Sequence, residues 1–207
     1  MKIKTIVVGP LQVNCYLLIC EKTGKAAVID PGADAPLIMQ AVAAAGCDVV
    51  LIINTHGHFD HIGANLRIKE ATGAELVIHA ADLPMLGQAG MHASVYGLTV
   101  ENSPPPDRLI SAGESLRVGN LDLDILHVPG HSPGSVCLHV GQHLIVGDVL
   151  FAESIGRTDL PGGDHQLLIR GIREKLFVLP DETMVHPGHG PDTSIGHEKI
   201  SNPFVHL

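Results

Sequence analysis

Side chains that can do chemistry are concentrated in one short segment. Residues 51–66, LIINTHGHFDHIGANL, place His56, His58, Asp60 and His61 directly behind an apolar run. Imidazoles and carboxylates are costly to bury without partners. Zinc and similar borderline ions accept both kinds of ligand. The segment therefore predicts a metal site.

The spacing within this segment suits two ions. If residues 56–58 are extended, His56 and His58 project to the same side, because strand side chains alternate between the two faces. Those two imidazoles can bind one ion. Asp60 and His61 are adjacent in the sequence, and at a turn that enters a helix their side chains can converge on a second ion.

Three more candidate ligands lie in the second half of the chain. His131 follows HVPG, Asp148 follows LIVG, and His189 lies in VHPGHG. Each comes after an apolar strand and a glycine, which places the side chain at the edge of a sheet where the backbone is free to turn. This recurrence predicts that the three join the first group. The other histidines, out of 14 in the chain, are expected to be structural or surface residues.

The composition and the hydrophobic pattern indicate which elements position these side chains. Of the 207 residues, 45% are hydrophobic and 17% are charged, which is typical of a globular α/β chain with a sizeable core. In the first half, short apolar runs bounded by turn residues alternate with segments of helical spacing. The predicted strands are 3–8, 14–20, 25–32, 48–55 and 74–80, and the predicted helices are 35–46, 61–73 and 82–86.

A segment without periodicity separates this half from the next. Residues 87–107 contain three consecutive prolines near their end and are expected to form an irregular loop or flap. The pattern of strands followed by a helix then repeats. The predicted strands are 114–119, 121–130, 134–140, 143–148 and 182–190, with a helix over 164–180. Two halves of this kind indicate an α/β fold, an αββα sandwich of two mixed β-sheets with helices outside.

The charge and the cysteines limit the function classes. The formal net charge is −9, and residues 169–175 are the one modestly basic stretch, which argues against nucleic acid as a partner. No apolar run reaches the roughly 18 residues of a membrane span, and Gly9 and Pro10 interrupt the first apolar stretch too early for a signal peptide. The four cysteines form no Cys-x-x-Cys pair and are expected to be reduced. We therefore expect a cytoplasmic protein that acts on a small molecule, without membrane or nucleic acid.

Four motifs, taken in order, resemble those of the metallo-β-lactamase superfamily. They are THGHFDH, PGHSPGS, VGD and PGHG, and they lie between about residue 54 and residue 190. The resemblance implies a single metallo-β-lactamase-fold domain over residues 1–207, with the αββα fold and a binuclear metal site. The implied ligands are His56, His58 and His131 on one ion, Asp60, His61 and His189 on the other, and Asp148 bridging both.

Binuclear sites of this kind carry out hydrolysis. Two divalent ions lower the pKa of a shared water, which gives hydroxide near neutral pH, and they polarise the carbonyl that it attacks. As catalytic residues, Asp148 would set the metal spacing and Asp60 would orient the hydroxide or accept its proton. Two zinc ions are expected, with iron or manganese as alternatives, because such sites discriminate poorly by affinity. The chain has no Gly-x-Ser-x-Gly elbow for a serine nucleophile.

Two further segments narrow the resemblance to the glyoxalase II-like branch. Residues 154–164, SIGRTDLPGGD, and residues 9–18, GPLQVNCYLL, are similar to its short bacterial single-domain hydrolases. The implied activity is that of a hydroxyacylglutathione hydrolase, a thioesterase that cleaves S-lactoylglutathione, a small anionic thioester. Arg157 is a candidate for substrate binding, with a loop salt bridge to Asp159 as the alternative. Residues 190–207 include no Tyr or Arg, so we expect no C-terminal glutathione-binding helical domain.

Two alternatives stay open. A persulfide dioxygenase with the same motifs would use a single iron, held by His56, His131 and Asp148 in a two-histidine, one-carboxylate arrangement. In that branch a Cys-Gly pair precedes Arg-Thr-Asp, whereas this chain has Ile155 and Gly156 there, which favours the hydrolase. A non-enzymatic, metal-stabilised binding module fits less well, since seven ligands for two ions leave positions open for water.

Overall fold

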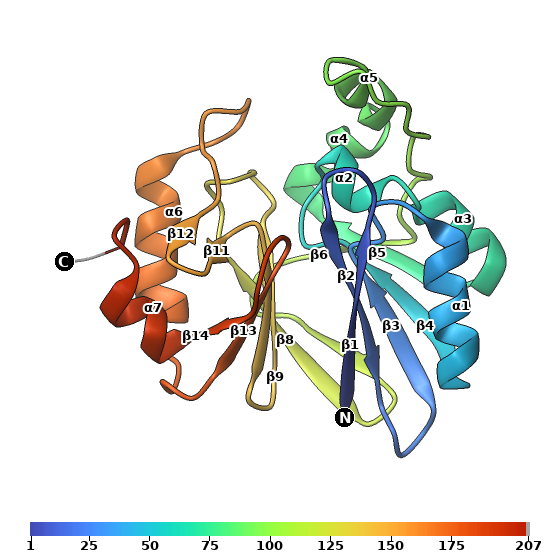
Figure 1. The fold of residues 1–207 in the computed structure, drawn as a ribbon, viewed down its shortest axis with the longest axis horizontal. Coiled ribbons are helices and arrows are strands. Elements are labelled where there is room, and N and C mark those ends of the chain that lie inside the picture. Colours follow the sequence, from blue (N-terminus) through green and yellow to red (C-terminus); the bar gives the residue numbers. More distant parts are fainter. Residues whose placement is uncertain (206–207) are drawn as a thin grey trace.

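Two six-stranded β-sheets face each other in the structure, a computed structural model that describes residues 1–205 (Figure 1). The first sheet has the order β1-β2-β3-β4-β5-β6. Its strands pair antiparallel from β1 to β3 and parallel from β3 to β6. The bounds are β1 (Lys2–Val8), β2 (Val13–Ile19), β3 (Lys25–Ile29), β4 (Asp48–Ile53), β5 (Glu75–His79) and β6 (Arg108–Ile110).

Helices make the crossovers that parallel neighbours require. In the first half, α1 (Ala35–Ala45) connects β3 to β4, and α3 (Asn65–Thr72) precedes β5. Both pack on the outer face of the first sheet. Helix α1 ends where Gly46 takes the left-handed conformation (φ 60°) and donates its N–H to the carbonyl of Ala43.

The second sheet has the order β14-β13-β10-β9-β8-β7, with β10 and β13 as its parallel pair. The crossover between those two strands contains α6 (His165–Gly171), which continues as a π-helical turn over Ile172–Leu176. Helix α6 begins where the Asp164 carboxylate accepts the N–H of Leu167 at 2.9 Å. The remaining bounds are β7 (Ser115–Val118), β8 (Leu121–His127), β9 (Val136–Val140), β10 (His143–Gly147), β11 (Leu150–Phe151), β12 (Ser154–Ile155), β13 (Met184–Pro187), β14 (Thr193–Ser194) and α7 (Ile195–Ser201).

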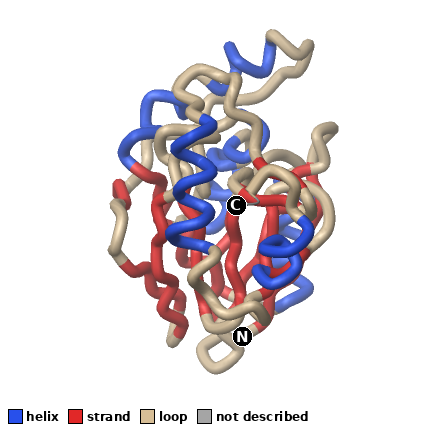
Figure 2. Tube along the Cα trace, turned by 90° about the vertical axis from the view of Figure 1, so that its left-hand side faces the viewer, coloured by secondary structure: helices blue, strands red, loops and turns tan. Residues whose placement is uncertain are grey.

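The buried hydrophobic side chains form three layers. One layer lies between the first sheet and its helices, one between the two sheets, and one between the second sheet and α6. Adjacent residues of a strand serve different layers, since Cys137 faces α6 and Leu138 faces the other sheet. Figure 2 shows the helices of the second half in front of the strands. This confirms the predicted αββα sandwich.

We expected residues 87–107 to form an irregular loop or flap, but part of this segment is helical. It contains α5 (Ala89–Ser94), which follows a 3₁₀ turn over Ala80–Asp82 and the short helix α4 (Leu83–Leu86). The sequence signal for α5 is weak because, of its six residues, the helix buries only two alanines, Ala89 and Ala93. We call residues 83–107 the flap, because the helices of this segment lie beyond the ends of the strands at one end of the molecule (Figure 1).

Two other expectations need correction. The helix predicted over 61–73 is broken into α2 (Phe59–Ile62) and α3, because the chain turns so that Ala64 can donate its N–H to the carbonyl of Pro31 at 2.8 Å. Strand β14 and helix α7 were not predicted, since the segment after residue 190 has few apolar residues. Among residues 1–205 no helix is both long enough and apolar enough to cross a membrane.

The layer between the sheets predicts where the fold is most sensitive. Leu138 is fully buried there, opposite Ile125 and Ile145 on the neighbouring strands. Leu138→Ala should lower the free energy of unfolding by about 2–5 kcal/mol, because the substitution leaves a cavity between two rigid sheets. Urea unfolding followed by circular dichroism measures this. Val178→Ala is the control, since Val178 is 71% exposed. Equal stability of the two variants would contradict the layer assignment.

Candidate metal centre

All seven predicted ligands lie at one rim of the sandwich, where the two sheets meet. His56 and His58 follow β4, while Asp60 and His61 lie in α2, directly after them. The second sheet supplies the others from the segments that follow strands, His131 after β8, Asp148 after β10 and His189 after β13. Ligand sites of α/β proteins commonly lie at the carboxyl ends of strands. The structure therefore brings together residues that are up to 133 positions apart in the sequence.

Three imidazoles form the first group. The ring centroid of His56 lies 4.8 Å from that of His58 and 4.8 Å from that of His131. The centroids of His58 and His131 are 4.5 Å apart. Nδ1 of His58 and Nε2 of His131 face each other at 2.8 Å. One ligand atom from each residue lies within 4.8 Å of the other two, which is the separation that a shared ion requires. This is the triad that the family resemblance implied for one ion.

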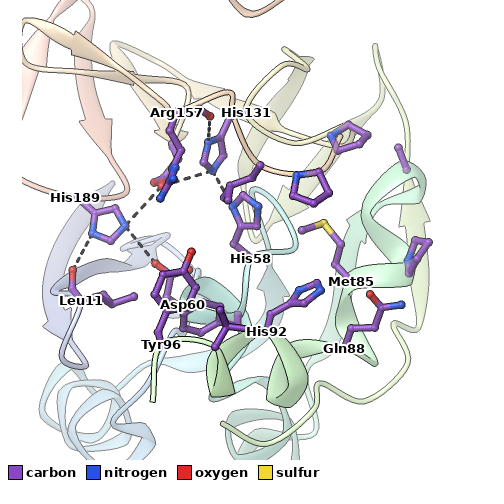
Figure 3. A pocket seen from close by; sticks show the side chains of 18 residues that line it. Leu11, His58, Asp60, Met85, Gln88, His92, Tyr96, His131, Arg157 and His189 are labelled. Carbon is purple, nitrogen blue, oxygen red and sulfur yellow. Dashed lines mark hydrogen bonds and ion pairs between the residues drawn. The ribbon is translucent and has the colours of Figure 1, made fainter. Parts of the chain in front are cut away.

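The second group contains Asp60, His61 and His189. Nε2 of His61 lies 3.3 Å from Nε2 of His189 and 3.7 Å from Oδ2 of Asp60. Nε2 of His189 lies 3.5 Å from the same carboxylate oxygen. These atoms also lie within 4.8 Å of one another. Figure 3 shows His189 and Asp60 joined in this way at one side of a cavity.

Asp148 lies between the two groups. Its Oδ2 is 3.6 Å from Nε2 of His131 and 3.6 Å from Nε2 of His189, and its Oδ1 is 3.4 Å from Nε2 of His61. Oδ1 of Asp148 and Nε2 of His56 are buried and have no hydrogen-bond partner within residues 1–205. Buried polar atoms without partners are rare in folded proteins. Two divalent ions would satisfy both atoms, so the residues fit a binuclear site with Asp148 as the bridge.

Hydrogen bonds on the outer side of the first sheet's histidines fix their orientation. Nδ1 of His61 lies 3.1 Å from Oδ2 of the buried Asp30. Nδ1 of His56 lies 3.1 Å from the hydroxyl of Thr55, which in turn donates to Asp30 at 2.6 Å. A carboxylate behind an imidazole fixes the tautomer in which Nε2 is free to bind a metal. A carboxylate oxygen of Asp30 also lies within 4.8 Å of ligand atoms of His56 and His61, but its hydrogen bonds to Thr55 and to the outer nitrogen of His61 favour an orienting role.

Main-chain carbonyls do the same for the second sheet's histidines. Nδ1 of His131 donates to the carbonyl of Arg157 at 2.8 Å, and Nδ1 of His189 donates to the carbonyl of Leu11 at 3.0 Å. Both rings therefore present Nε2 to the centre. Sequence reasoning missed these partners, because a carbonyl leaves no trace in residue type. It also missed Asp30, although this residue follows an apolar strand just as the ligands do.

Two imidazoles of the first group, His56 and His58, are held in the neutral form. Burial and the neighbouring His131 lower the pKa of His58 to about 3. Burial lowers the pKa of His56 well below its usual value, and the surrounding imidazoles add to this by repulsion. A neutral imidazole is the form that binds a metal ion. The packing of these rings thus keeps them in the ligand form.

The second group holds a positive charge between carboxylates. Burial opposes the charged form of His61, but Asp148, Asp60 and Asp30 outweigh it and raise its pKa to about 10. Burial alone would raise the pKa of Asp60, but His61 and His189 outweigh it and hold that pKa below its usual value. A cation is thus strongly stabilised at this point. A metal ion and the proton on His61 compete for the same place.

A second buried carboxylate ties the two ligand-bearing loops together. Asp82 accepts the N–H of Gly57 at 2.9 Å, the hydroxyl of Ser132 at 2.6 Å and the N–H of Gly134 at 2.6 Å. Gly57 lies between two ligands of the first sheet, and Ser132 follows His131 of the second. Asp82 therefore fixes the distance between the loops. The sequence gives no sign of this role.

The centre opens into a cavity of about 780 Å³, and Figure 3 draws the 18 side chains that line it. One wall is the flap, and the opposite wall is the loop that contains Arg157. The guanidinium of Arg157 makes two hydrogen bonds to Asp159, at 2.7 and 2.8 Å. The loop salt bridge considered from the sequence is therefore present, and substrate binding by Arg157 stays a prediction.

Most of the chain matches one known family. The family model described as Metallo-beta-lactamase superfamily matches residues 8–189. The probable metallo-hydrolase YqgX of Bacillus subtilis is 39% identical, and the match covers 99% of this chain and 98% of the relative. The hydroxyacylglutathione hydrolase GloC of Haemophilus influenzae is 38% identical, with 99% of this chain and 98% of the relative covered.

Solved structures share the arrangement of sheets and helices. BLEG-1, described as a B3 metallo-beta-lactamase, superposes with a TM-score of 0.93 at 38% identity and covers 99% of both chains. TTHA1623, solved in a di-iron-bound form, has a TM-score of 0.89 at 37% identity over 97% of this chain and 99% of its own. ETHE1 from Myxococcus xanthus has a TM-score of 0.82 at 31% identity over 98% of this chain and 84% of its own.

The position of Asp148 predicts the effect of removing it. Asp148→Ala should reduce bound metal from about two ions per chain to one or fewer, because its carboxylate contacts both groups. Elemental analysis after dialysis measures the loss. His79→Ala is the control, since His79 stacks on His127 and contacts none of the seven ligands. Retention of two ions by Asp148→Ala would show that the bridge is assigned wrongly.

The hydrogen bonds of Asp30 predict a weaker effect at a distance. Asp30→Asn should lower metal affinity about 10–100-fold while the protein stays folded, because an amide cannot accept from His61 and Thr55 with the strength of a carboxylate. Competition with a chromophoric chelator measures the affinity. Asp48→Asn, which changes an exposed partner of Lys25, is the control. If both variants bound metal like the unmodified chain, Asp30 would have no orienting role.

Proposed function

Since the chain belongs to the metallo-beta-lactamase superfamily, we propose that it is a binuclear metal-dependent hydrolase, a thioesterase of the hydroxyacylglutathione hydrolase type. The observation that carries this proposal is the pair of three-residue groups joined by Asp148. The 38% identity to GloC of Haemophilus influenzae over 99% of this chain supports the thioester as substrate. The di-iron-bound TTHA1623 supports the presence of two ions in this fold.

The residues of the centre divide the work of hydrolysis. Two divalent ions held by these residues, with zinc as the expected metal and iron or manganese as alternatives, would supply a water of lowered pKa and would polarise a bound carbonyl. Asp148 fixes the separation of the two groups, because each of its oxygens faces one or both of them. Asp60 lines the cavity and is the general base that accepts the proton of the attacking water.

The persulfide dioxygenase is the second candidate. It would use one iron on His56, His131 and Asp148, and the structural likeness to ETHE1 from Myxococcus xanthus is compatible with it. The geometry favours the hydrolase, because Asp60, His61 and His189 are gathered as closely as the first group. A mononuclear centre would leave that second group without a function.

Metal content and substrate use together test this proposal. We expect about two ions per purified chain. We also expect hydrolysis of S-lactoylglutathione, measured as the loss of thioester absorbance, and no oxygen uptake with glutathione persulfide. The reason is that both groups supply three close ligand atoms. One iron per chain together with oxygen uptake and no hydrolysis would establish the dioxygenase. Two ions without turnover of either substrate would favour a metal-stabilised binding module.

A further inference from the structure

The flap presents one face of its helices to the cavity. Met85, Gln88, His92 and Tyr96 follow one another at helical intervals, and all four line the cavity. Main-chain hydrogen bonds from Gln88 to Met85 and from His92 to Gln88, each 3.0 Å, keep this face continuous across the junction of α4 and α5. Figure 3 shows Met85, Gln88 and His92 on the side of the cavity across from Arg157 and His131. This face is therefore placed to meet the part of a substrate that extends from the reacting carbonyl.

Two of these side chains have unused hydrogen-bonding groups. In the part of the chain that the structure describes, neither the amide of Gln88 nor the imidazole of His92 makes a hydrogen bond to protein. His92 lines the same cavity as His58 and Asp60 of the metal centre. An amide and a neutral imidazole each offer one donor and one acceptor or more. They match a secondary amide, which also offers both.

Away from the metal centre, the cavity walls offer few charged partners for an anionic peptide. Among the lining residues described, Arg157 is the one lysine or arginine, and Asp159 already binds its guanidinium through two nitrogens. The carboxylates of glutathione would need free cationic groups for tight binding. The walls consist instead mainly of apolar side chains, among them Val95 and Leu160. Such walls suit a neutral chain that contains methylene groups.

On the basis of the thioesterase function proposed above, we propose that the cavity binds a neutral, amide-bearing leaving thiol, an N-acylaminoalkyl thiol. Gln88 and His92 hydrogen-bond its amide, and Met85 contacts its methylene groups. Hydrolysis breaks the carbon–sulfur bond, forms a carbon–oxygen bond to the oxygen of water, and leaves a carboxylic acid and a thiol that takes one proton of that water. The specificity lies in the thiol, because this is the part that the flap reaches.

Two thioesters with the same acyl group test this inference. S-lactoyl-N-acetylcysteamine is neutral and carries one amide, whereas S-lactoylglutathione carries the charged peptide. We expect kcat/KM for the neutral ester to equal or exceed that for the glutathione ester. Gln88→Leu should lower kcat/KM about five- to tenfold for the neutral ester, mainly through KM, because one hydrogen bond is lost at nearly constant size. Gln142→Leu, an exposed change outside the cavity lining, is the matched control.

Two results would contradict the proposed binding of a neutral, amide-bearing thiol. A glutathione ester that is more than tenfold better than the neutral ester would overturn the inference. So would an unchanged kcat/KM of Gln88→Leu for the neutral ester, since Gln88 would then not bind the amide of the thiol.

A binding measurement separates this inference from the proposed function. Non-hydrolysable thioethers of N-acetylcysteamine and of glutathione, with the same hydroxyalkyl group in place of lactoyl, are titrated into the purified protein by calorimetry. If neither ester is hydrolysed but the neutral thioether binds at least as tightly as the glutathione thioether, the thioesterase proposal fails and the cavity assignment holds. If the glutathione thioether binds more than tenfold tighter, or the neutral one does not bind, the cavity assignment is wrong whatever the turnover.

Discussion

The carboxylate of Asp30 fixes the geometry on which the rest of the centre depends. Its Oδ1 accepts the N–H of Thr55, and its Oδ2 accepts the hydroxyl of Thr55 and faces Nδ1 of His61. Through Thr55 it also orients His56, so one buried group sets an imidazole in each of the two ligand groups. Asp30 has a positive φ of 52°, a conformation that costs free energy in a residue other than glycine. The chain accepts this strain at the point where β3 ends and the ligand network begins.

A site built from two sheets also requires that the two sheets keep a fixed position relative to each other. Below the rim they are held by apolar packing, which is not directional. At the rim the contacts are polar and specific. Asn14 donates to the carbonyls of Pro187 and Gly190 at 2.9 Å each, and the Tyr16 hydroxyl donates to that of Pro187 at 2.6 Å. These bonds hold the segment of His189 against the first sheet, as Asp82 holds the loop of His131. Directional bonds are therefore concentrated where a small displacement would separate the ligands.

Five of the seven predicted ligands share one kind of position, after an apolar strand and beside a glycine, and Asp60 and His61 follow two of them in the same short motif. Asp30 also follows an apolar strand, but sequence does not tell whether a carboxylate contacts a metal or the outer nitrogen of a ligand. Asp82 carried no signal, since its partners lie 25 to 52 positions away in two other loops. The fold class followed from hydrophobic periodicity. Strand β14 and helix α7 could not be predicted from periodicity. This segment owes its structure to the pairing of β14 with β13 and not to an apolar pattern of its own.

The two walls of the cavity differ in how they are coupled to the metal centre. The wall that contains Arg157 orients His131 through a main-chain carbonyl, so a shift of that backbone moves a ligand. The flap supplies none of the hydrogen bonds that orient the seven ligands within residues 1–205. Its hydrogen bonds to the rest of the chain lie elsewhere, as where the hydroxyl of Ser103 accepts from Asn65 of α3 at 2.9 Å. Exposed side chains of the flap such as Gln88 can therefore change with little effect on the geometry of the centre. A fold with this division can keep its metal chemistry while the thiol or acyl group that it accepts changes.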